Sequence, residues 1–130
     1  MAPRSEEYQR AAELRAALRQ FLRVSEQVAR AHGLTPQRYS LLLMIRSAPG
    51  ERSTVTELAK RLQLAQSTVT ELVHRAEVAR LVQREPSSED GRVAYLRLTP
   101  EGARRLAGVV TELGPEQRRL ADILGQKLIA

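Results

Sequence analysis

TVTELAKRLQLAQSTVTELVHRAEVARLVQREPSSEDGRVAYLRL, residues 54–98, is the stretch that decides the fold of this chain. Its first part places apolar residues at the three- and four-residue spacing of one helical face, from Val55 to Leu62. Thr56 can accept a hydrogen bond from an early backbone N–H, and Glu57 suits the positive end of a helix dipole. We therefore expect a short helix that begins near Thr56.

A longer helical pattern follows after an interruption at residues 63–65. Val69, Val73 and Ala76 belong to its inner face, which predicts a helix over about residues 66–79. The outward or flanking positions then carry Gln66, Ser67, Thr70, Glu71, His74 and Arg75. Short hydrogen-bonding side chains near the N-terminus of a second helix suit the major groove of DNA. Any solvated amphipathic helix also turns polar residues outward, so the helix pair alone leaves a purely structural role open.

Two alternating apolar runs, residues 81–85 and 93–98, can each form a strand, and the polar segment between them reads as a hairpin tip. Gly91 suits a positive φ at that tip. Arg92 on such a loop can enter a minor groove, and Asp90 could hold its guanidinium. A solvated hairpin with an incidental ion pair is the alternative. A helix pair followed by a hairpin is the order of a winged helix-turn-helix, which points to double-stranded DNA.

Several ordered segments of the chain resemble the multiple antibiotic resistance regulator (MarR) family of bacterial transcription factors. These are residues 56–62, 67–70, 72–73 with Arg75 and Glu77, 81–82, 90–92 and 98–102. The resemblance implies a homodimer whose second helix enters the major groove and whose wing arginine enters the minor groove. The candidate DNA-binding residues are Gln66, Ser67, Thr68, Thr70, Glu71, His74, Arg75, Arg84, Asp90 and Arg92.

Three positions depart from the pattern of that family. Ala65 stands where a serine-like cap is usual, so the second helix lacks a side-chain acceptor at its start. Glu71 stands where many relatives carry arginine; its carboxylate would repel phosphate but could accept from a cytosine amino group. Arg80 replaces the glycine that usually ends the helix, which predicts strain or a local rearrangement.

Composition narrows the class of protein. The 130 residues, 42% hydrophobic and 28% charged, suit one globular core, and we expect a cytoplasmic protein without a membrane span or signal segment. The absence of cysteine excludes thiol-based sensing, and with only His32 and His74 a histidine-rich zinc site is not expected, so no metal or cofactor is predicted. No nucleophile elbow, phosphate loop or oxyanion loop accompanies His74, so an enzyme is not predicted.

The net charge of +6 lies mostly outside the predicted winged core. Residues 1–52 carry nine arginines and five glutamates, whereas residues 53–99 carry seven basic and six acidic residues. Nucleic-acid binding would thus depend on where Arg75, Arg84 and Arg92 point, helped by arginines such as Arg38 or Arg52. The near-neutral core also keeps an alternative open, a winged-helix module that docks a protein instead of DNA.

Helical stripes flank this core on both sides. We expect a first helix over about residues 6–31, a buried central helix opened by Thr35 and Pro36, and a C-terminal helix broken or kinked at residues 114–115. The terminal stripes predict a dimer interface, with folding back onto the same chain as the alternative. The candidate dimerisation residues are Leu14, Leu18, Phe21, Leu106, Val110, Leu113, Leu120, Leu124 and Leu128.

The whole chain is expected to be one mainly α domain with a small β-hairpin, an α+β winged helix-turn-helix. Residues 35–99 form the DNA-binding core, and residues 5–32 and 100–130 form the dimerisation helices. A symmetric dimer predicts an inverted-repeat operator with half-sites roughly 10 bp apart, and the mechanism we favour is repression by occupancy. The resemblance also implies a small-molecule effector, often an aromatic acid or phenol, in a crevice around Phe21, His32, Tyr39 and Leu42. The polar contacts of Tyr39 and His32 could equally be structural.

Overall fold

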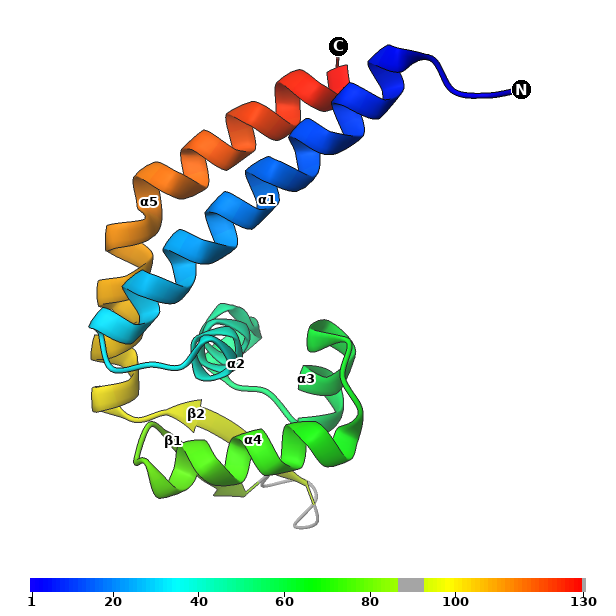
Figure 1. The fold of residues 1–130 in the computed structure, drawn as a ribbon. Helices are drawn as coiled ribbons and strands as arrows, with labels where there is room; N and C mark the ends of the chain where they lie inside the picture. The colour runs from blue at the N-terminus through cyan, green and yellow to red at the C-terminus, as the bar shows by residue number, and fades with distance from the viewer. Residues whose placement is uncertain (87–92, 130) are drawn as a thin grey trace.

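The structure is a computed structural model that describes residues 1–86 and 93–129 (Figure 1). As predicted, it is mainly helical with one antiparallel hairpin. The elements in chain order are α1 (Ser5–Ala31), α2 (Pro36–Ser47), the 3-10 helix η1 (Pro49–Glu51), α3 (Val55–Leu62), α4 (Gln66–Val78), β1 (Val82–Pro86), β2 (Ala94–Leu98) and α5 (Pro100–Ile129).

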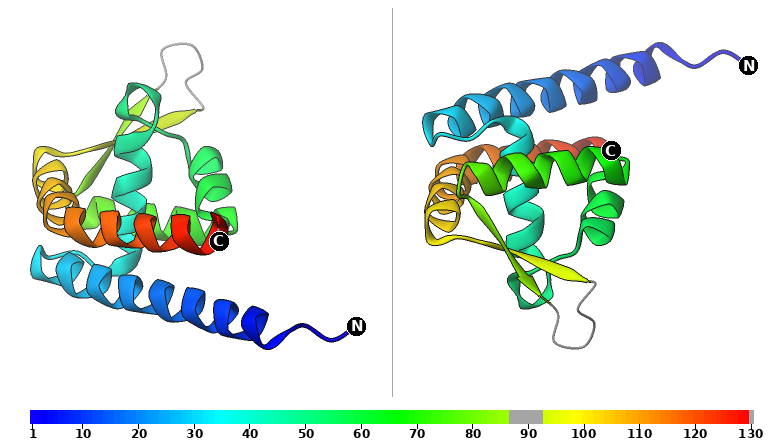
Figure 2. Two further views of the ribbon diagram at one scale, coloured as in Figure 1. Left: turned by 90° about the horizontal axis from the view of Figure 1, so that it is seen from above. Right: turned by 90° about the horizontal axis from the view of Figure 1, so that it is seen from below.

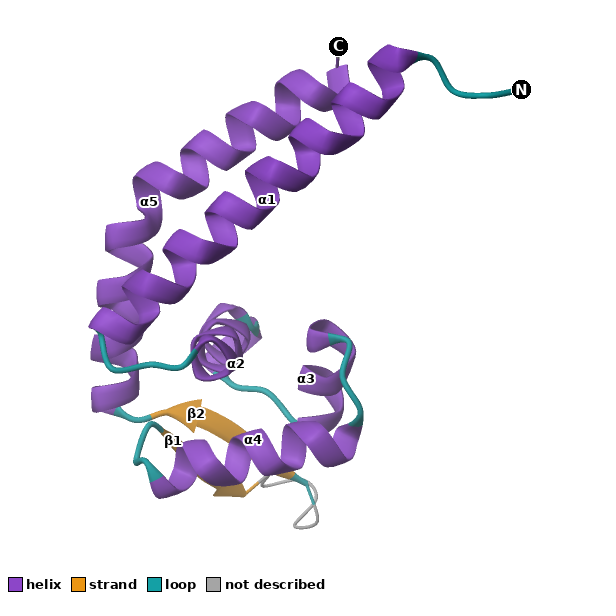
Figure 3. Ribbon diagram, viewed as in Figure 1, coloured by secondary structure: helices purple, strands orange, loops and turns teal. Residues whose placement is uncertain are grey.

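The helices α1 and α5 lie side by side and form a long arm that carries both termini at its outer end (Figures 1 and 2). The other elements form a winged core at the opposite end, where α2 is surrounded by α3, α4 and the hairpin (Figure 3). We call the β1–β2 hairpin the wing. This division places α4 and the wing at the end of the molecule away from the termini.

The core is centred on α2, as its nearly all-round apolar sequence predicts. Leu41, Leu42 and Ile45 are each 0% exposed. They belong to one apolar cluster with the inner face of α4 and the first half of α5. Because burial of a leucine or isoleucine side chain contributes about 1.5–3 kcal/mol, these contacts fix α4 and α5 against α2.

The start of α3 corrects one prediction. The helix is capped by Thr54 and not by Thr56, because Thr54 Oγ1 accepts a hydrogen bond from the Glu57 backbone N–H at 3.2 Å. Glu57 Oε2 accepts in return from the Thr54 N–H at 3.2 Å, which completes a capping box. The start of α2 is as predicted, with Thr35 Oγ1 accepting from the Arg38 N–H at 3.2 Å ahead of Pro36.

The exit from α4 shows the strain predicted for Arg80. This residue has φ 60°, in the left-handed region that disfavours side chains with a Cβ. The chain then enters β1, which pairs with β2 so that Val82 faces Leu98 and Glu85 faces Tyr95. The first strand lies one residue later than predicted at both ends, and the second begins at Ala94 instead of Val93.

The helix α5 continues through Pro115, so the chain does not break there. Proline lacks the backbone N–H that the helical ladder needs at that point, and α5 changes direction along its length in Figure 1. Of the two predicted outcomes, the kink is the one found. No helix in the described part of the chain is long and apolar enough to span a membrane.

Candidate nucleic-acid interface

The polar face of α4 is the centre of the candidate interface. The helix buries Val69, Val73 and Ala76 against the core. Its opposite face is exposed, as predicted, and carries Gln66, Ser67, Thr68, Thr70, Glu71, His74 and Arg75. Because α4 and the wing lie together at the end of the molecule away from the termini, this face is open to a large partner (Figure 1).

The N-terminus of α4 offers hydroxyl groups that are not engaged elsewhere. Ala65 occupies the N-cap position and supplies no side-chain hydrogen bond, as predicted. No hydrogen bond joins the hydroxyls of Ser67, Thr68 or Thr70 to another residue in the described part of the chain. Gln66 is different, because its Nε2 donates to Thr56 Oγ1 at 3.1 Å and ties α4 to α3. The exposed hydroxyls can therefore bond an incoming ligand without breaking an internal bond.

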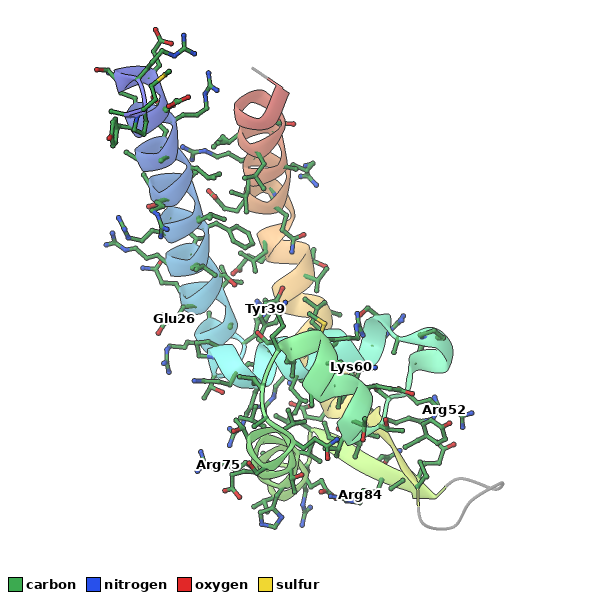
Figure 4. All side chains as sticks on the ribbon, turned by 90° about the vertical axis from the view of Figure 1, so that its right-hand side faces the viewer. Glu26, Tyr39, Arg52, Lys60, Arg75 and Arg84 are labelled. Atoms are coloured by element: carbon green, nitrogen blue, oxygen red, sulfur yellow. The ribbon has the colours of Figure 1, made fainter. Side chains whose placement is uncertain are left out.

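The arginines of this face are held by carboxylates. Arg75 Nε lies 3.0 Å from Glu71 Oε1, one helical turn earlier. Arg84 Nε on β1 donates to both carboxylate oxygens of Glu77 at 3.1 Å, which links the wing to α4. Figure 4 labels both side chains, Arg75 beside α4 and Arg84 beside the strands of the wing. Each of these arginines thus has a carboxylate beside it, in keeping with the near-neutral charge of the core. Because both ion pairs are exposed, neither contributes more than about 1 kcal/mol to stability.

A groove beside α4 brings a further arginine to the interface. It has a volume of about 380 Å³, and its lining includes Arg38 of α2 together with Thr68 and Arg75 of α4. Arg38 was expected to assist binding, and the structure places it next to two of the candidate DNA-binding residues. The tip pair Asp90 and Arg92 lies outside the described residues, so its role stays a prediction.

The base of the wing carries a charged cluster that the sequence analysis missed. The Arg52 guanidinium lies 4.0 Å from the centre of the Tyr95 ring, and its Nη1 is 3.5 Å from Glu85 Oε1. Glu85 also pairs with Arg97, whose Nη1 donates to the Gly50 carbonyl oxygen at 3.2 Å. The hairpin register could have predicted that Glu85 lies beside Tyr95. The approach of Arg52 could not be predicted, because it depends on the long-range pairing of Ser53 with Leu96.

The candidate dimerisation residues differ in exposure. Leu106 and Leu113 are 3% and 0% exposed in the single chain, so they are core residues, and their assignment to a dimer interface is wrong. Leu18 and Val110 are exposed at 39% and 37%. Leu22, at 64%, was missed although it lies four residues after Leu18 on the same helical face. Half-buried positions on the arm are Leu14, Phe21, Leu120 and Leu124, while the side chain of Leu128 lies outside the described part.

The residues expected near an effector have different surroundings in the structure. Tyr39 and Leu42 are buried in the core, and burial raises the pKa of the Tyr39 hydroxyl. His32 packs at the junction of α1 and α5, with its Nε2 3.8 Å from Glu112 Oε1. Phe21 instead lines a small groove between α1 and α5. In residues 1–86 and 93–129, no group of three acidic, histidine or cysteine side chains is placed to hold a metal ion.

Comparison with known proteins identifies the architecture. Residues 32–93 match the sequence model of the MarR family. Curated protein sequences contain no match to the chain. AbsC, a MarR family transcriptional regulator from Streptomyces coelicolor, has a similar structure, with a TM-score of 0.79 and 23% identity over 92% of this chain and 81% of its own.

Two structures that contain DNA are also similar. A mutant of MarR from E. coli complexed with operator DNA has a TM-score of 0.74 and 20% identity, covering 93% of this chain and 89% of its own. A mutant of S. aureus MepR bound to an oligodeoxyribonucleotide has a TM-score of 0.71 and 19% identity, covering 86% and 81%. At identities this low, the structural similarity establishes the fold alone. The segment that matches the family model, residues 32–93, covers nearly all of the winged core. Most of the winged core therefore matches the MarR family, and the chain as a whole has the winged helix fold of the MarR regulators of known structure.

Proposed function

We propose that this chain is a MarR family regulator, a sequence-specific double-stranded DNA-binding repressor that acts as a homodimer on an inverted-repeat operator. Each subunit would place α4 in the major groove and the wing against the adjacent minor groove. Repression would result from occupancy of the promoter. A small-molecule effector that changes the spacing of the two wings would release the protein from the operator and so end repression.

The observation that carries this proposal is the exposed polar face of α4 beside the wing. Ser67, Thr68 and Thr70 present hydroxyls that have no internal partner in the described part of the chain. Arg38 and Arg75 line one groove together with Thr68. Hydroxyls and arginines in this arrangement suit phosphates and base edges, and two proteins of similar fold have been solved in complex with DNA.

The exposed leucines of the arm support the dimer. Leu18 and Leu22 lie on one face of α1 and are 39% and 64% exposed, and Val110 of α5 is 37% exposed. Apolar groups on both helices of an extended arm would be covered by a second copy of the same arm, as in a twofold interface. Two copies of α4 would then face DNA together.

Selection from random duplex DNA, with sequencing of what remains bound at moderate salt, tests the proposal. Enrichment of an inverted repeat with half-sites roughly 10 bp apart is expected, with an affinity that falls steeply as salt is raised. A protein-docking module would show no enrichment and no sequence preference. That outcome would reject specific DNA binding.

A matched pair of variants locates the binding face. Arg75 and Arg30 are both exposed and both pair with a glutamate one turn earlier, at 3.0 Å and 3.2 Å. Arg75→Ala should weaken binding to the selected operator about tenfold, since it removes a cation at α4. Arg30→Ala on the arm should bind like the unaltered protein. Equal losses in both variants would show that binding reflects net charge and not this face.

A further inference from the structure

Glu71 presents a free acceptor at the centre of the α4 face. Its Oε1 accepts from Arg75 Nε at 3.0 Å, whereas Oε2 has no hydrogen bond within the described residues. Both side chains are well exposed, at 58% for Glu71 and 64% for Arg75. We propose that Glu71 is a specificity-determining residue that reads a cytosine amino group in each operator half-site. This inference rests on the proposed function.

The chemistry of the major groove selects cytosine for a carboxylate acceptor. Only cytosine N4 and adenine N6 are amino donors there, and adenine sets the N7 acceptor beside its amino group. An ionised carboxylate only accepts hydrogen bonds, so N7 of adenine would repel it, and guanine and thymine offer acceptors alone. Cytosine is therefore the base whose major-groove edge fits Glu71 Oε2.

Arg75 makes a carboxylate tolerable on this face and acts as a positioning residue. An unpaired Glu71 would be repelled by the phosphates on both sides of the groove. The bond from Arg75 Nε offsets this charge and directs the carboxylate through one oxygen, which leaves the other to the base.

Glu77 on the same helix shows the contrasting arrangement. Both of its carboxylate oxygens accept from Arg84 Nε at 3.1 Å, and its side chain is only 27% exposed. Neither oxygen of Glu77 is left without a hydrogen bond, so neither is available to a base. Glu77 therefore provides a matched control for the removal of one negative charge from α4.

The test repeats the random-duplex selection with Glu71→Gln, Glu71→Ala and Glu77→Gln. The unaltered protein should enrich cytosine about tenfold at one position of each half-site. A glutamine can bond both N6 and N7 of adenine, so Glu71→Gln should change the preference at that position from cytosine to adenine. Glu71→Ala should lose the preference without gaining another, and Glu77→Gln should retain cytosine.

The outcomes separate this inference from the proposed function. An inverted repeat in which no position responds to Glu71→Gln or Glu71→Ala overturns the base contact and leaves the proposed function intact. Failure of the unaltered protein to enrich any sequence overturns both. A change in preference from cytosine to adenine supports the contact directly, because loss of charge or of folding would not create a preference for adenine.

The role of Arg75 is tested by a double variant. If Arg75 acts partly by offsetting Glu71, then Arg75→Ala should weaken binding by a larger factor in the unaltered background than in the Glu71→Gln background. Equal factors would show that Arg75 contacts DNA independently of Glu71 and would remove its positioning role.

Discussion

Thr99 Oγ1 donates a hydrogen bond to the Arg80 carbonyl oxygen at 2.7 Å, and through this bond the start of α5 holds the exit of α4. The same hydroxyl accepts from the Gly102 N–H at 3.0 Å. Backbone contacts reinforce the junction, since the Thr99 N–H donates to the Leu81 carbonyl oxygen at 3.0 Å. The arm is thus fastened to the exit of α4 by one threonine.

Replacement of Thr99 by valine should destabilise the protein by about 1–2 kcal/mol, because it removes both side-chain hydrogen bonds while nearly preserving volume. Urea unfolding followed by circular dichroism measures the change. Thr99→Ser retains the hydroxyl and should lose much less. A valine variant as stable as the serine variant would show that the hydroxyl does not hold this junction.

Arg80→Gly should stabilise the protein by about 0.5–1 kcal/mol, since relief of the left-handed φ of 60°, worth about 1–2 kcal/mol, exceeds the cost of the added backbone freedom of the unfolded chain, about 0.5–1 kcal/mol. Ala79, the preceding residue, has φ −76° and ψ −1° and provides the control. Ala79→Gly gains nothing from relieved strain and should destabilise through the added backbone freedom of the unfolded chain. Loss of stability in both variants would contradict the strain assigned to Arg80.

Ala65→Ser should also stabilise the protein, by about 1 kcal/mol. Ala65 already has the extended backbone of an N-cap residue, with φ −65° and ψ 148°, but supplies no acceptor to the first turn of α4. The reverse change at the start of α3, Thr54→Ala, removes an existing cap and should cost about the same amount. Thermal unfolding of the two variants should therefore shift in opposite directions.

Local patterns predicted most of the fold. The spacing of apolar residues located α1, α4 and both strands to within a residue or two, and Thr35 with Pro36 located the start of α2, because each of these signals depends only on neighbours along the chain. The misplaced cap of α3 was readable as well. Thr54 and Glu57 have the spacing of a capping box, which is a stronger signal than the single hydroxyl of Thr56.

Contacts between distant segments could not be predicted in this way. The stripe of α5 was visible, but α1 and α2 decide which part of it the chain buries, so Leu106 and Leu113 were indistinguishable from the exposed Val110. The sequence likewise identified each charged residue of α4 but not its partner on another element. That Glu77 uses both oxygens on Arg84 of the wing depends on how the hairpin packs against the helix.

Acid should weaken the start of α5. Hydrogen bonds from Arg104 and then Arg105 lower the pKa of Glu101 from 4.5 to about 2. A carboxyl with a lowered pKa in the folded state contributes stability that is fully present above pH 4.5 and is lost as the pH falls towards about 2. Glu101→Gln should therefore reduce the dependence of unfolding on pH in that window, with little change in the dependence near neutrality. An unaltered acid dependence would contradict the assignment.

Two glycines of α5 should respond to alanine with opposite signs. A Cβ on Gly102 would lie 2.2 Å from the Leu81 carbonyl oxygen, which is rigid backbone at the exit of α4, so Gly102→Ala should destabilise the protein by about 1–3 kcal/mol. A Cβ on Gly125 would meet nothing within 4 Å, and Gly125→Ala should stabilise the helix by about 0.5–1 kcal/mol. Because both changes add the same methyl group to the same helix, the difference isolates the close approach of α5 to Leu81. Unfolding by urea at one pH gives both values, and a Gly102 variant that gains stability would place the arm farther from the exit of α4 than the structure does. Under the proposed function, displacement of this contact would also displace α4 from its place on DNA, so the Gly102 variant should bind the selected operator more weakly than the Gly125 variant.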